Sequence, residues 1–537
     1  MSDTGLPATM AVGSAQGVRV LALQVESAER TIVQPFDAAV LPGEMLAIIG
    51  ESGSGKSLTA RAITGLLPRG VRATGHSEID GYSYDLAASS AGVWREVRGR
   101  RAVLLLQDPF TSLSPVLRCG EQIALTVEAR LGRSPGRAAL QAEVERRLAE
   151  VQLPARVAKM YPTELSGGMR QRVAIAAALA AEPRLLIADE PTTALDASTQ
   201  GEVLDLLRSL QLAHRMSLIL ISHDLGVIEG RADRVCVMRN GEVVEQGTSS
   251  QVLQNPQHEY TRALIAANPS ISDAASSVSP APQSNPPILV ATSVSKSFGD
   301  TAALTDASVE VAAGEVLAIV GESGSGKSTL ARAIAGLEVP DTGTVTLHSK
   351  QLPAGRRGRK PGQIQIVFQD PYSTLNPSFT IEQSLQEALR AGGDRTRTVR
   401  DLLELVELDS KLATRRPSQL SGGQRQRVSI ARALAPNPEV LICDESVSAL
   451  DVSVQAQILA LLARLRDELG LAMLFITHDL GVVARIANNV IVLRNGEIVE
   501  RGETERVLRA PQHTYTKLLV AAAEQDSVHR ESREARE

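Results

Sequence analysis

The stretch Gly50–Ser57 reads GESGSGKS, and the same eight residues recur at Gly321–Ser328. Each octet follows a short apolar run and precedes a helix-like pattern, Leu58–Leu67 in the first case and Thr329–Leu337 in the second. A strand, a glycine-rich loop and a helix form the context expected of a phosphate-binding loop. The glycines let backbone N–H groups face inward, and the helix N-terminus adds partial positive charge. The sequence therefore predicts two sites for a nucleoside triphosphate.

The polar residues of each octet complete the predicted site. Lys56 and Lys327 should reach the β- and γ-phosphates, and Ser57 and Ser328 should place a hydroxyl on Mg²⁺. The loop residues expected to contact ATP are Gly50, Ser52, Gly53, Gly55, Lys56, Ser57, Gly321, Ser323, Gly324, Gly326, Lys327, Ser328 and Thr329.

Two further apolar runs, RLLIADE and EVLICDE, end in adjacent acids, Asp189-Glu190 and Asp444-Glu445. Carboxylates at the end of a buried strand are costly unless a cation or ligand uses them. Asp189 and Asp444 are the partners that Mg²⁺ needs in a P-loop site. Glu190 and Glu445, next to the metal, are expected to polarise the attacking water.

The chain contains two copies of one sequence repeat. The offset between the copies is 271 residues at the glycine-rich loops and 262 near residue 107, and it stays at 255 from Ser166 to Pro256. Other repeated segments are RNGEV with RNGEI and PQHEYT with PQHTYT. A Ser/Pro-rich stretch between the copies is typical of a flexible linker. The predicted divisions are a tail at 1–17, a first domain at 18–267, the linker at 268–287, a second domain at 288–524 and a charged tail at 525–537.

Composition limits the classes of function. A chain of 537 residues exceeds the roughly 250–300 that one core supports. Net charge is −5 and aromatic content is 2%, which disfavours a nucleic-acid partner. No apolar run approaches the roughly 18–20 residues of a membrane span, and no signal-peptide pattern opens the chain, so we expect a cytoplasmic protein. Cys119, Cys236 and Cys443 have neither metal nor disulfide spacing and are expected to be small buried residues.

The segments LSGGMRQR, at Leu165–Arg172, and LSGGQRQR, at Leu420–Arg427, resemble the LSGGQ signature of ABC ATPases. Serine and glycine at the start of a helix offer a hydroxyl and free N–H groups, which suit a γ-phosphate. The resemblance extends from about Val18 to Leu519 and implies an α/β fold: two tandem P-loop NTPase domains, each with a RecA-like core, a small β subdomain and a helical signature subdomain.

The resemblance also assigns roles to single residues. It implies Q-loop glutamines that reach ATP and Mg²⁺, D-loops at Ala194–Asp196 and Ala449–Asp451, and catalytic switch histidines that act beside Glu190 and Glu445. In the family the two domains close head to tail on two ATP molecules, so each signature serves the loop of the other copy. The residues concerned are Gln107, Gln369, His223, His478, Ser166, Gly167, Gly168, Ser421, Gly422, Gly423 and Gln424.

Within that family, QDPFTSLSPV, QDPYSTLNP and the PQHxYT segments look like those of peptide-importer ATPases, and the chain is similar to two such subunits fused. The resemblance implies permease subunits in the membrane, an extracytoplasmic solute-binding protein and a peripheral position on the cytoplasmic face of the cell membrane. Length differences flank the two Q-loop segments, Asp108–Val116 and Asp370–Phe379, so we expect two non-identical permeases. Dipeptides and oligopeptides are the expected solutes; peptide-like antibiotics, glutathione and nickel chelates remain alternatives.

Three features differ from the family pattern. Phe298 can stack on adenine in the second copy, whereas the first copy offers only Val25. Ser446 replaces a usual proline, with little expected effect. The cysteine cluster that holds an iron–sulfur cluster in some relatives is missing, so we expect no such cofactor.

A ribosome-associated tandem ABC factor is the alternative from another class. Such factors usually carry a long charged helical linker, and their switch histidine is usually followed by Asp-Arg, unlike His223-Asp224-Leu225. A DNA-repair ABC ATPase would need zinc cysteines or a long inserted coiled coil. The basic runs Arg95–Arg101 and Arg356–Lys360 are interpreted as solvated turns.

Overall fold

The computed structural model describes residues 17–88, 90–107, 112–192, 197–222, 224–226, 228–268, 286–370, 374–392, 396–448 and 450–528. These residues form two compact units that divide between Ile265 and Ala266. Each unit contains one six-stranded and one four-stranded sheet, which confirms the expected pair of α/β domains.

A mixed sheet forms the centre of the first unit, with strand order β10-β9-β3-β8-β7-β6. All pairs are parallel except β9 with β10. In β3, Met45, Ala47 and Ile49 pack on one side of the sheet, whereas Leu46 and Ile48 pack on the other. Burial on both faces explains why these strands are continuous apolar runs. The strands are β3 (Met45–Ile49), β6 (Ala102–Leu105), β7 (Leu185–Asp189), β8 (Ser217–Ile221), β9 (Arg234–Arg239) and β10 (Glu242–Thr248).

An antiparallel sheet with the order β2-β1-β4-β5 covers one face of this centre. Strand β1 bulges at Ala22, whose φ of 48° lies in the left-handed region. The strands of this sheet are β1 (Val18–Ser27), β2 (Thr31–Val40), β4 (Val71–Ile79) and β5 (Tyr82–Asp85).

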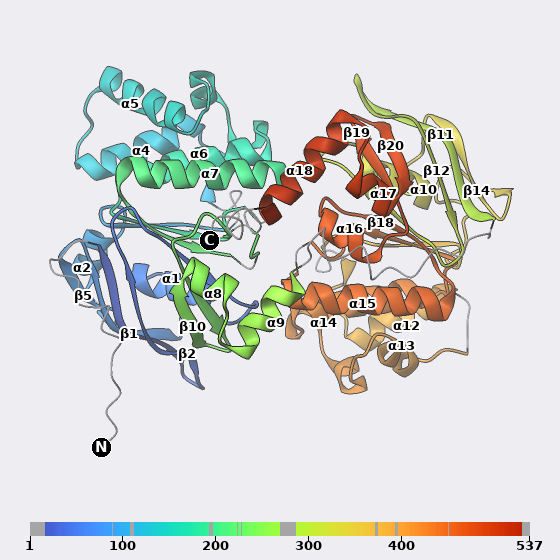
Figure 1. Ribbon diagram of the computed structural model, residues 1–537, viewed down its shortest axis with the longest axis horizontal. Helices are drawn as coiled ribbons and strands as arrows, with labels where there is room; N and C mark the ends of the chain where they lie inside the picture. Colours follow the sequence, from blue (N-terminus) through green and yellow to red (C-terminus); the bar gives the residue numbers. More distant parts are fainter. Residues whose placement is uncertain are drawn as a thin grey trace. The chain divides into compact units, whose positions relative to one another are not determined.

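Most helices pack on the other face and extend from it, whereas those at 56–64 and 91–97 pack on the side of the antiparallel sheet. Figure 1 shows α4, α5 and α6 gathered at one end of the unit, away from β1 and β2. The helices are α1 (Lys56–Thr64), α2 (Ala91–Val97), α4 (Cys119–Leu131), α5 (Arg137–Glu150), α6 (Gly167–Leu179), α7 (Ala197–His214), α8 (Ser249–Gln254) and α9 (Glu259–Ala267), with 3₁₀ turns η1 (Ala155–Lys159) and η2 (Pro162–Glu164).

The second unit repeats both sheets. Its mixed sheet has the order β16-β17-β18-β13-β19-β20 and its antiparallel sheet the order β12-β11-β14-β15. The strands are β11 (Pro287–Phe298), β12 (Thr301–Ala312), β13 (Val316–Val320), β14 (Thr342–Leu347), β15 (Lys350–Gln351), β16 (Ile364–Val367), β17 (Val440–Asp444), β18 (Ala472–Ile476), β19 (Asn489–Arg494) and β20 (Glu497–Glu503).

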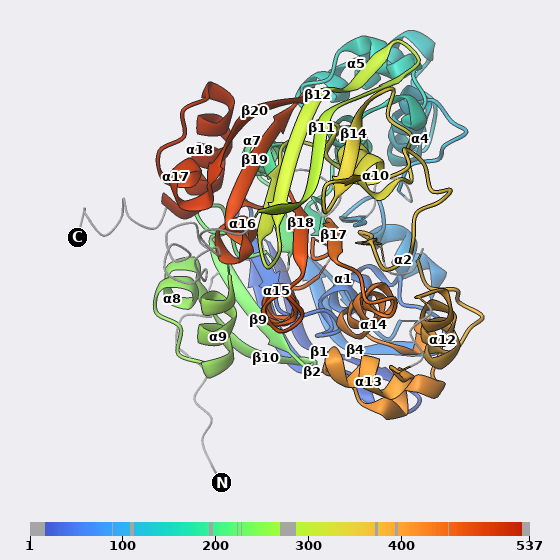
Figure 2. The ribbon, with the colours of Figure 1, turned by 90° about the vertical axis from the view of Figure 1, so that its right-hand side faces the viewer.

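The helices of the second unit are arranged like those of the first. Figure 2 shows α12, α13 and α14 together at one end of this unit, with β11, β12 and β14 at the other. The helices are α10 (Lys327–Ala335), α12 (Ile381–Gly392), α13 (Val399–Leu405), α14 (Gly422–Leu434), α15 (Val452–Leu469), α16 (Leu480–Ile486), α17 (Thr504–Arg509) and α18 (Thr514–Val528), with 3₁₀ turns η4 (Ser410–Thr414) and η5 (Pro417–Gln419).

Helix boundaries differ from the apolar patterns in the sequence. Helix α1 begins at Lys56 and α6 at Gly167, because the helix caps are Gly55 and Ser166 rather than the first apolar residues. Helix α18 continues to Val528, within the predicted charged tail.

Most residues of the two basic runs are exposed, as predicted, but one arginine in each run also bonds to a helix end. Arg98 donates from Nε to the carbonyl of Thr64 at 2.8 Å and from its guanidinium to that of Gly65, at the end of α1. Arg359 donates likewise to the carbonyl of Ile334 in α10. A helix ends with unpaired carbonyls and partial negative charge, which a guanidinium satisfies. Each run therefore caps the helix that follows a phosphate loop.

Cys119, Cys236 and Cys443 are free and buried, as expected from their spacing. Burial raises the pKa of the Cys236 thiol to about 12. Among the described residues, no helix combines the length and the apolarity that a bilayer span requires.

Candidate nucleotide site

The phosphate loops connect β3 with α1 and β13 with α10. Gly50 has a φ of 144°, and a Cβ there would lie 2.0 Å from the carbonyl oxygen of Met238. Gly321 has a φ of 152° and approaches the carbonyl oxygen of Leu493 in the same way, at 2.1 Å. Only glycine allows this approach of two backbones. Gly53 and Gly324, by contrast, face open space, with φ near 80°.

Each loop curls around its own lysine. Lys56 Nζ donates to the carbonyl oxygens of Gly50 and Glu51, at 2.7 and 2.9 Å. Lys327 Nζ donates to those of Gly321 and Glu322, both at 2.7 Å. The ammonium groups thus lie at the N-termini of α1 and α10, where helix dipole and free N–H groups attract anions.

A hydroxyl and a carboxylate meet beside each loop. Ser57 Oγ donates to Asp189 Oδ1 at 2.9 Å, and Ser328 Oγ donates to Asp444 Oδ1 at the same distance. Burial raises the pKa of both carboxyl groups, although the serine hydrogen bonds lower it in part. Oxygen donors beside a phosphate loop, with a buried acid that a cation would stabilise, fit Mg²⁺.

The second acid of each pair has an unusual backbone. Glu190 and Glu445 both have a φ of 47°, which is uncommon outside glycine and tends to occur at functional sites. Their N–H groups donate to Ile221 and Ile476 in the neighbouring strand, at 2.9 and 3.0 Å. These bonds fix the left-handed backbone conformation of each glutamate, at the carboxyl end of the parallel strands.

Residues of the predicted site contact both glutamates. Gln107 Nε2 donates to Glu190 Oε2 at 2.8 Å. His478 Nδ1 lies 3.8 Å from Glu445 Oε1, and interaction with this ring lowers the pKa of Glu445. Burial opposes protonation of His478, but Glu445 outweighs it and raises the pKa of the histidine. Gln369 is exposed, and His223 lies outside the described residues.

The signature residues begin helices α6 and α14. Ser166 Oγ accepts from the N–H of Met169 at 3.4 Å, and Ser421 Oγ from that of Gln424 at 3.3 Å. Both serines are exposed, and the following glycines, Gly167 and Gly422, open the helices. Gly168 and Gly423 lie so close to Thr199 and Val454 that a Cβ would approach their methyl groups to 2.5 and 2.6 Å. The signatures therefore offer exposed helix N-termini.

Phe298 ends β11, and its side chain is exposed. Lys296 Nζ lies 5.4 Å from the ring centroid. Counted from the bulges that β1 and β11 share, Ser27 stands where the second unit has Phe298. Val25 is fully buried and offers no surface to a base, so the suggested equivalence with Val25 was wrong.

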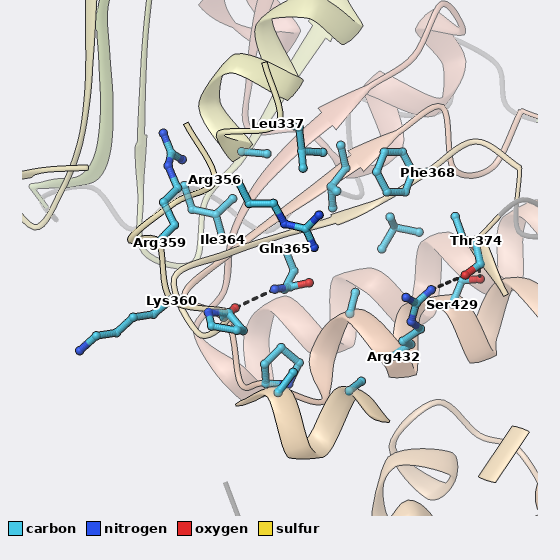
Figure 3. A pocket seen from close by; sticks show the side chains of 18 of the residues that line it. Leu337, Arg356, Arg359, Lys360, Ile364, Gln365, Phe368, Thr374, Ser429 and Arg432 are labelled. Carbon is cyan, nitrogen blue, oxygen red and sulfur yellow. Dashed lines mark hydrogen bonds between the residues drawn. The ribbon is translucent and has the colours of Figure 1, made fainter. Parts of the chain in front are cut away.

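A pocket of about 460 Å³ lies in the second unit, where the end of α10 meets β16, α12 and α14 (Figure 3). It adjoins the Q-loop, because Phe368 precedes Gln369 and Thr374 follows shortly after. Arg432 donates to the carbonyl of Thr374, and Gln365 Nε2 donates to that of Pro361 at 2.8 Å. Its lining joins apolar side chains with basic ones, including Leu337, Ile364, Ala388, Arg356, Arg359 and Lys360.

Comparison with known proteins agrees with this geometry. The family model "ABC transporter" matches residues 33–193 and 304–448. The model "Oligopeptide/dipeptide transporter, C-terminal region" matches residues 244–301 and 499–536.

Similar proteins span nearly the whole chain. The glutathione import ATP-binding protein GsiA of Escherichia coli (strain K12) is 42% identical over 89% of this chain and 84% of its own length. The protein of the same name from Pectobacterium atrosepticum is 41% identical over 92% of this chain and 86% of its own length. These matches do not support a ribosome-associated factor. The chain belongs to the ABC transporter family, as a tandem ATP-binding and ATP-hydrolysing protein of the oligopeptide/dipeptide importer group.

Proposed function

We propose that this chain powers the import of dipeptides, oligopeptides or peptide-like solutes such as glutathione into a bacterial cell. The observation that carries the proposal is the match of both copies, together with their C-terminal regions, to proteins named for glutathione import. Nickel chelates remain the alternative solute class.

The site residues have the following roles in the proposal. Ser57 with Asp189, and Ser328 with Asp444, would hold Mg²⁺, assisted by Gln107 and Gln369, and the bound ion would supply positive charge to the phosphates. Glu190 and Glu445 take a proton from the attacking water, and His223 and His478 orient it towards the γ-phosphate. Support comes from the short Ser–Asp contacts and from the fixed turn at each glutamate.

Each ATP is shared by the two copies in this proposal. In the ATP-bound state that we propose, Gly50–Ser57 would face the signature Ser421–Gln424, and Gly321–Ser328 would face Ser166–Met169. The exposed helix N-termini at Ser166 and Ser421 support this role, since each can receive a γ-phosphate from another domain.

The partners are two non-identical permeases, and through them an extracytoplasmic solute-binding protein, which places the chain at the cytoplasmic face of the cell membrane. The pocket beside Gln369 supports this proposal, because a cavity next to the Q-loop that is lined by apolar and basic side chains can receive a helix of another protein. In the first copy Val116, within the Q-loop segment, is 78% exposed. Phe110 and Tyr372, which we expect to contact the permeases, lie outside the described residues.

Uptake tests the solute class. Cells that lack this chain, but retain its permeases and binding protein, would receive the wild type or the Glu190→Gln/Glu445→Gln variant. Labelled glutathione, a dipeptide, an oligopeptide and a nickel chelate would then be supplied separately. We expect the wild type alone to restore accumulation of a peptide-like solute. Restoration of nickel uptake only, or of none of the four, would contradict the proposal.

Co-purification tests the docking surface. Leu337 lines the pocket and is 43% exposed, so Leu337→Asp should release the permease at little cost to folding. Leu518→Asp is the matched control, because Leu518 is 64% exposed on α18 and does not line the pocket. ATP hydrolysis by the isolated chain should be unchanged in both variants. Equal permease recovery with both would exclude the pocket as the dock.

A further inference from the structure

A tyrosine hydroxyl contacts the start of each phosphate loop. Tyr260 Oη accepts a hydrogen bond from the N–H of Glu51 at 3.2 Å, and Tyr515 Oη accepts one from the N–H of Glu322 at 3.0 Å. The partners are 209 and 193 residues apart in the sequence. Both tyrosines are buried, with 6% and 3% exposure. They are the tyrosines of the repeated PQHxYT segments, to which the catalytic mechanism gives no role.

The preceding residues hold this segment in place. Glu245, on β10, accepts hydrogen bonds from the N–H groups of Gln257 and His258 at 2.8 and 3.2 Å. The N–H of Tyr260 in turn donates to His258 Nδ1 at 3.1 Å. The segment is thus tied to the sheet just before it presents its tyrosine.

The second copy repeats each of these contacts. Glu500 accepts from the N–H groups of Gln512 and His513 at 2.8 and 3.0 Å, and the N–H of Tyr515 donates to His513 Nδ1 at 3.2 Å. The same geometry in two copies with different neighbouring residues indicates a shared role rather than incidental packing.

The turn with the repeated sequence RNGE contacts both the tyrosine and the phosphate loop. The guanidinium carbon of Arg239 lies 4.7 Å from the Tyr260 ring centroid. The N–H of Gly241 in the same turn donates to the carbonyl of Ser54, within the phosphate loop, at 3.1 Å. In the second copy, Arg494 lies 4.8 Å from the Tyr515 ring, and Gly496 donates to Ser325 at 2.9 Å. The turn therefore holds both the loop and the tyrosine.

We propose that Tyr260 and Tyr515 are positioning residues for the phosphate loops, through which the C-terminal region of each copy sets nucleotide affinity. The loops are rich in glycine and lose much conformational entropy when they are ordered around phosphate. A hydrogen bond at the first residue after the leading glycine limits that loss, because the loop is already curled before ATP arrives. This inference rests on ATP binding alone and does not depend on the transported solute.

Removal of one hydroxyl tests the proposal. In the full chain carrying Lys327→Ala, which confines tight binding to the first loop, Tyr260→Phe would be titrated with ATP and with ADP below the melting temperature. Without this hydrogen bond the loop is no longer held curled before the nucleotide arrives, so the dissociation constants should rise about tenfold, the effect of losing one hydrogen bond. Both nucleotides should be affected equally, because the loop binds the phosphates that they share. In a Lys56→Ala chain, Tyr515→Phe should weaken binding of both nucleotides at the second loop to the same extent.

Tyr84→Phe in the Lys327→Ala background is the matched control. Tyr84 is 5% exposed in the same copy, and its hydroxyl donates to the carbonyl of Ile63 at 2.7 Å, away from the loop. Tyr84→Phe should leave nucleotide affinity unchanged. Tyr260→Phe should weaken nucleotide affinity, although the two variants should have equal melting temperatures. Unchanged affinity in Tyr260→Phe would overturn the proposal, as would an equal loss in Tyr84→Phe. In an otherwise wild-type chain carrying both Tyr→Phe changes, a fall in kcat with an unchanged KM for ATP would also contradict it.

Discussion

Replacing both Glu190 and Glu445 with glutamine tests whether these residues are the bases of ATP hydrolysis. Glutamine has nearly the size of glutamate, and its amide oxygen can still accept the 2.8 Å bond from Gln107. The left-handed backbone at both positions, with a φ of 47°, is fixed by bonds to Ile221 and Ile476 that the substitution leaves in place. At Glu190 the change therefore removes mainly the ability to take a proton. At Glu445 it also removes the negative charge that raises the pKa of His478.

The size of the effect follows from that role. A positioned general base contributes roughly 10²–10⁴ in rate, or about 2.7–5.4 kcal/mol of barrier. Binding should persist, because Lys56 and the Ser57–Asp189 pair do not involve the glutamate side chain. We thus expect the double variant to hydrolyse ATP at least 100-fold more slowly and to bind ATP as the wild type does.

Phosphate release at saturating Mg²⁺ and ATP measures turnover, and equilibrium titration of the same preparation measures binding. The matched control is Glu202→Gln with Glu404→Gln, two exposed glutamates that pair with arginines on helices. Such surface pairs contribute little, so the control should retain full turnover. Wild-type turnover in the Glu190/Glu445 variant would refute the assignment. Loss of ATP binding would show that these residues hold nucleotide rather than activate water.

Further predictions concern affinity and stability. Stacking on an aromatic contributes about 1–3 kcal/mol per base in nucleic-acid complexes, so Phe298→Ala should weaken ATP binding at the second loop about tenfold. The first loop, titrated in a Lys327→Ala chain, should bind ATP more weakly than the second loop, titrated in a Lys56→Ala chain. Equal affinities of the two loops would disprove the role of Phe298. Arg147 is fully buried and contacts Glu143 at 3.0 Å, so Arg147→Ala should cost about 3 kcal/mol or more in urea unfolding, whereas Arg400→Ala, in an exposed pair, should cost under about 0.5. A hydrogen bond from Arg146 is the main cause that lowers the pKa of Glu143 to about 2. This carboxylate therefore stabilises the fold above about pH 4.5 and loses that effect as pH falls towards 2, so the stability difference between wild type and Glu143→Gln should disappear over that range.

Short sequence motifs predicted those parts of the candidate site whose residues lie close together in the sequence. The GESGSGKS octets predicted a strand, a loop and a helix, because glycine, lysine and serine at those positions allow few other structures. The acids at the ends of β7 and β17 were predicted from the cost of ending a buried strand in two carboxylates. Both features depend on residues close together in sequence, which is why they could be recognised.

Features that depend on distant residues were missed. The bond from Glu51 to Tyr260 joins residues 209 apart, and nothing in PQHEYT alone indicates its target. The guanidinium of Arg98 looked solvated because its acceptors, the last carbonyls of α1, become neighbours only in the fold. The turned backbone of Glu190 had no signal either, since glutamate seldom adopts a positive φ. Repetition was the one usable signal, because PQHxYT recurs with its tyrosine in register.

The contacts to the phosphate loop explain why the two copies keep their register where they do. Asp189 bonds to Ser57, and Tyr260 bonds to Glu51, so two points of the later sequence are fixed on one loop. The separation from Asp189 to Tyr260 is 71 residues, and it is also 71 between the corresponding residues of the second copy. Between these points the chain passes through the core strands β8 and β9, where an insertion would displace one contact or the other. Before Gln107 the two copies differ in length, since their offset falls from 271 at the loops to 262 at Gln107. There Trp94 covers Gly65 in one copy and Arg359 covers Gly336 in the other, and the segments that supply them differ in length without disturbing the loop.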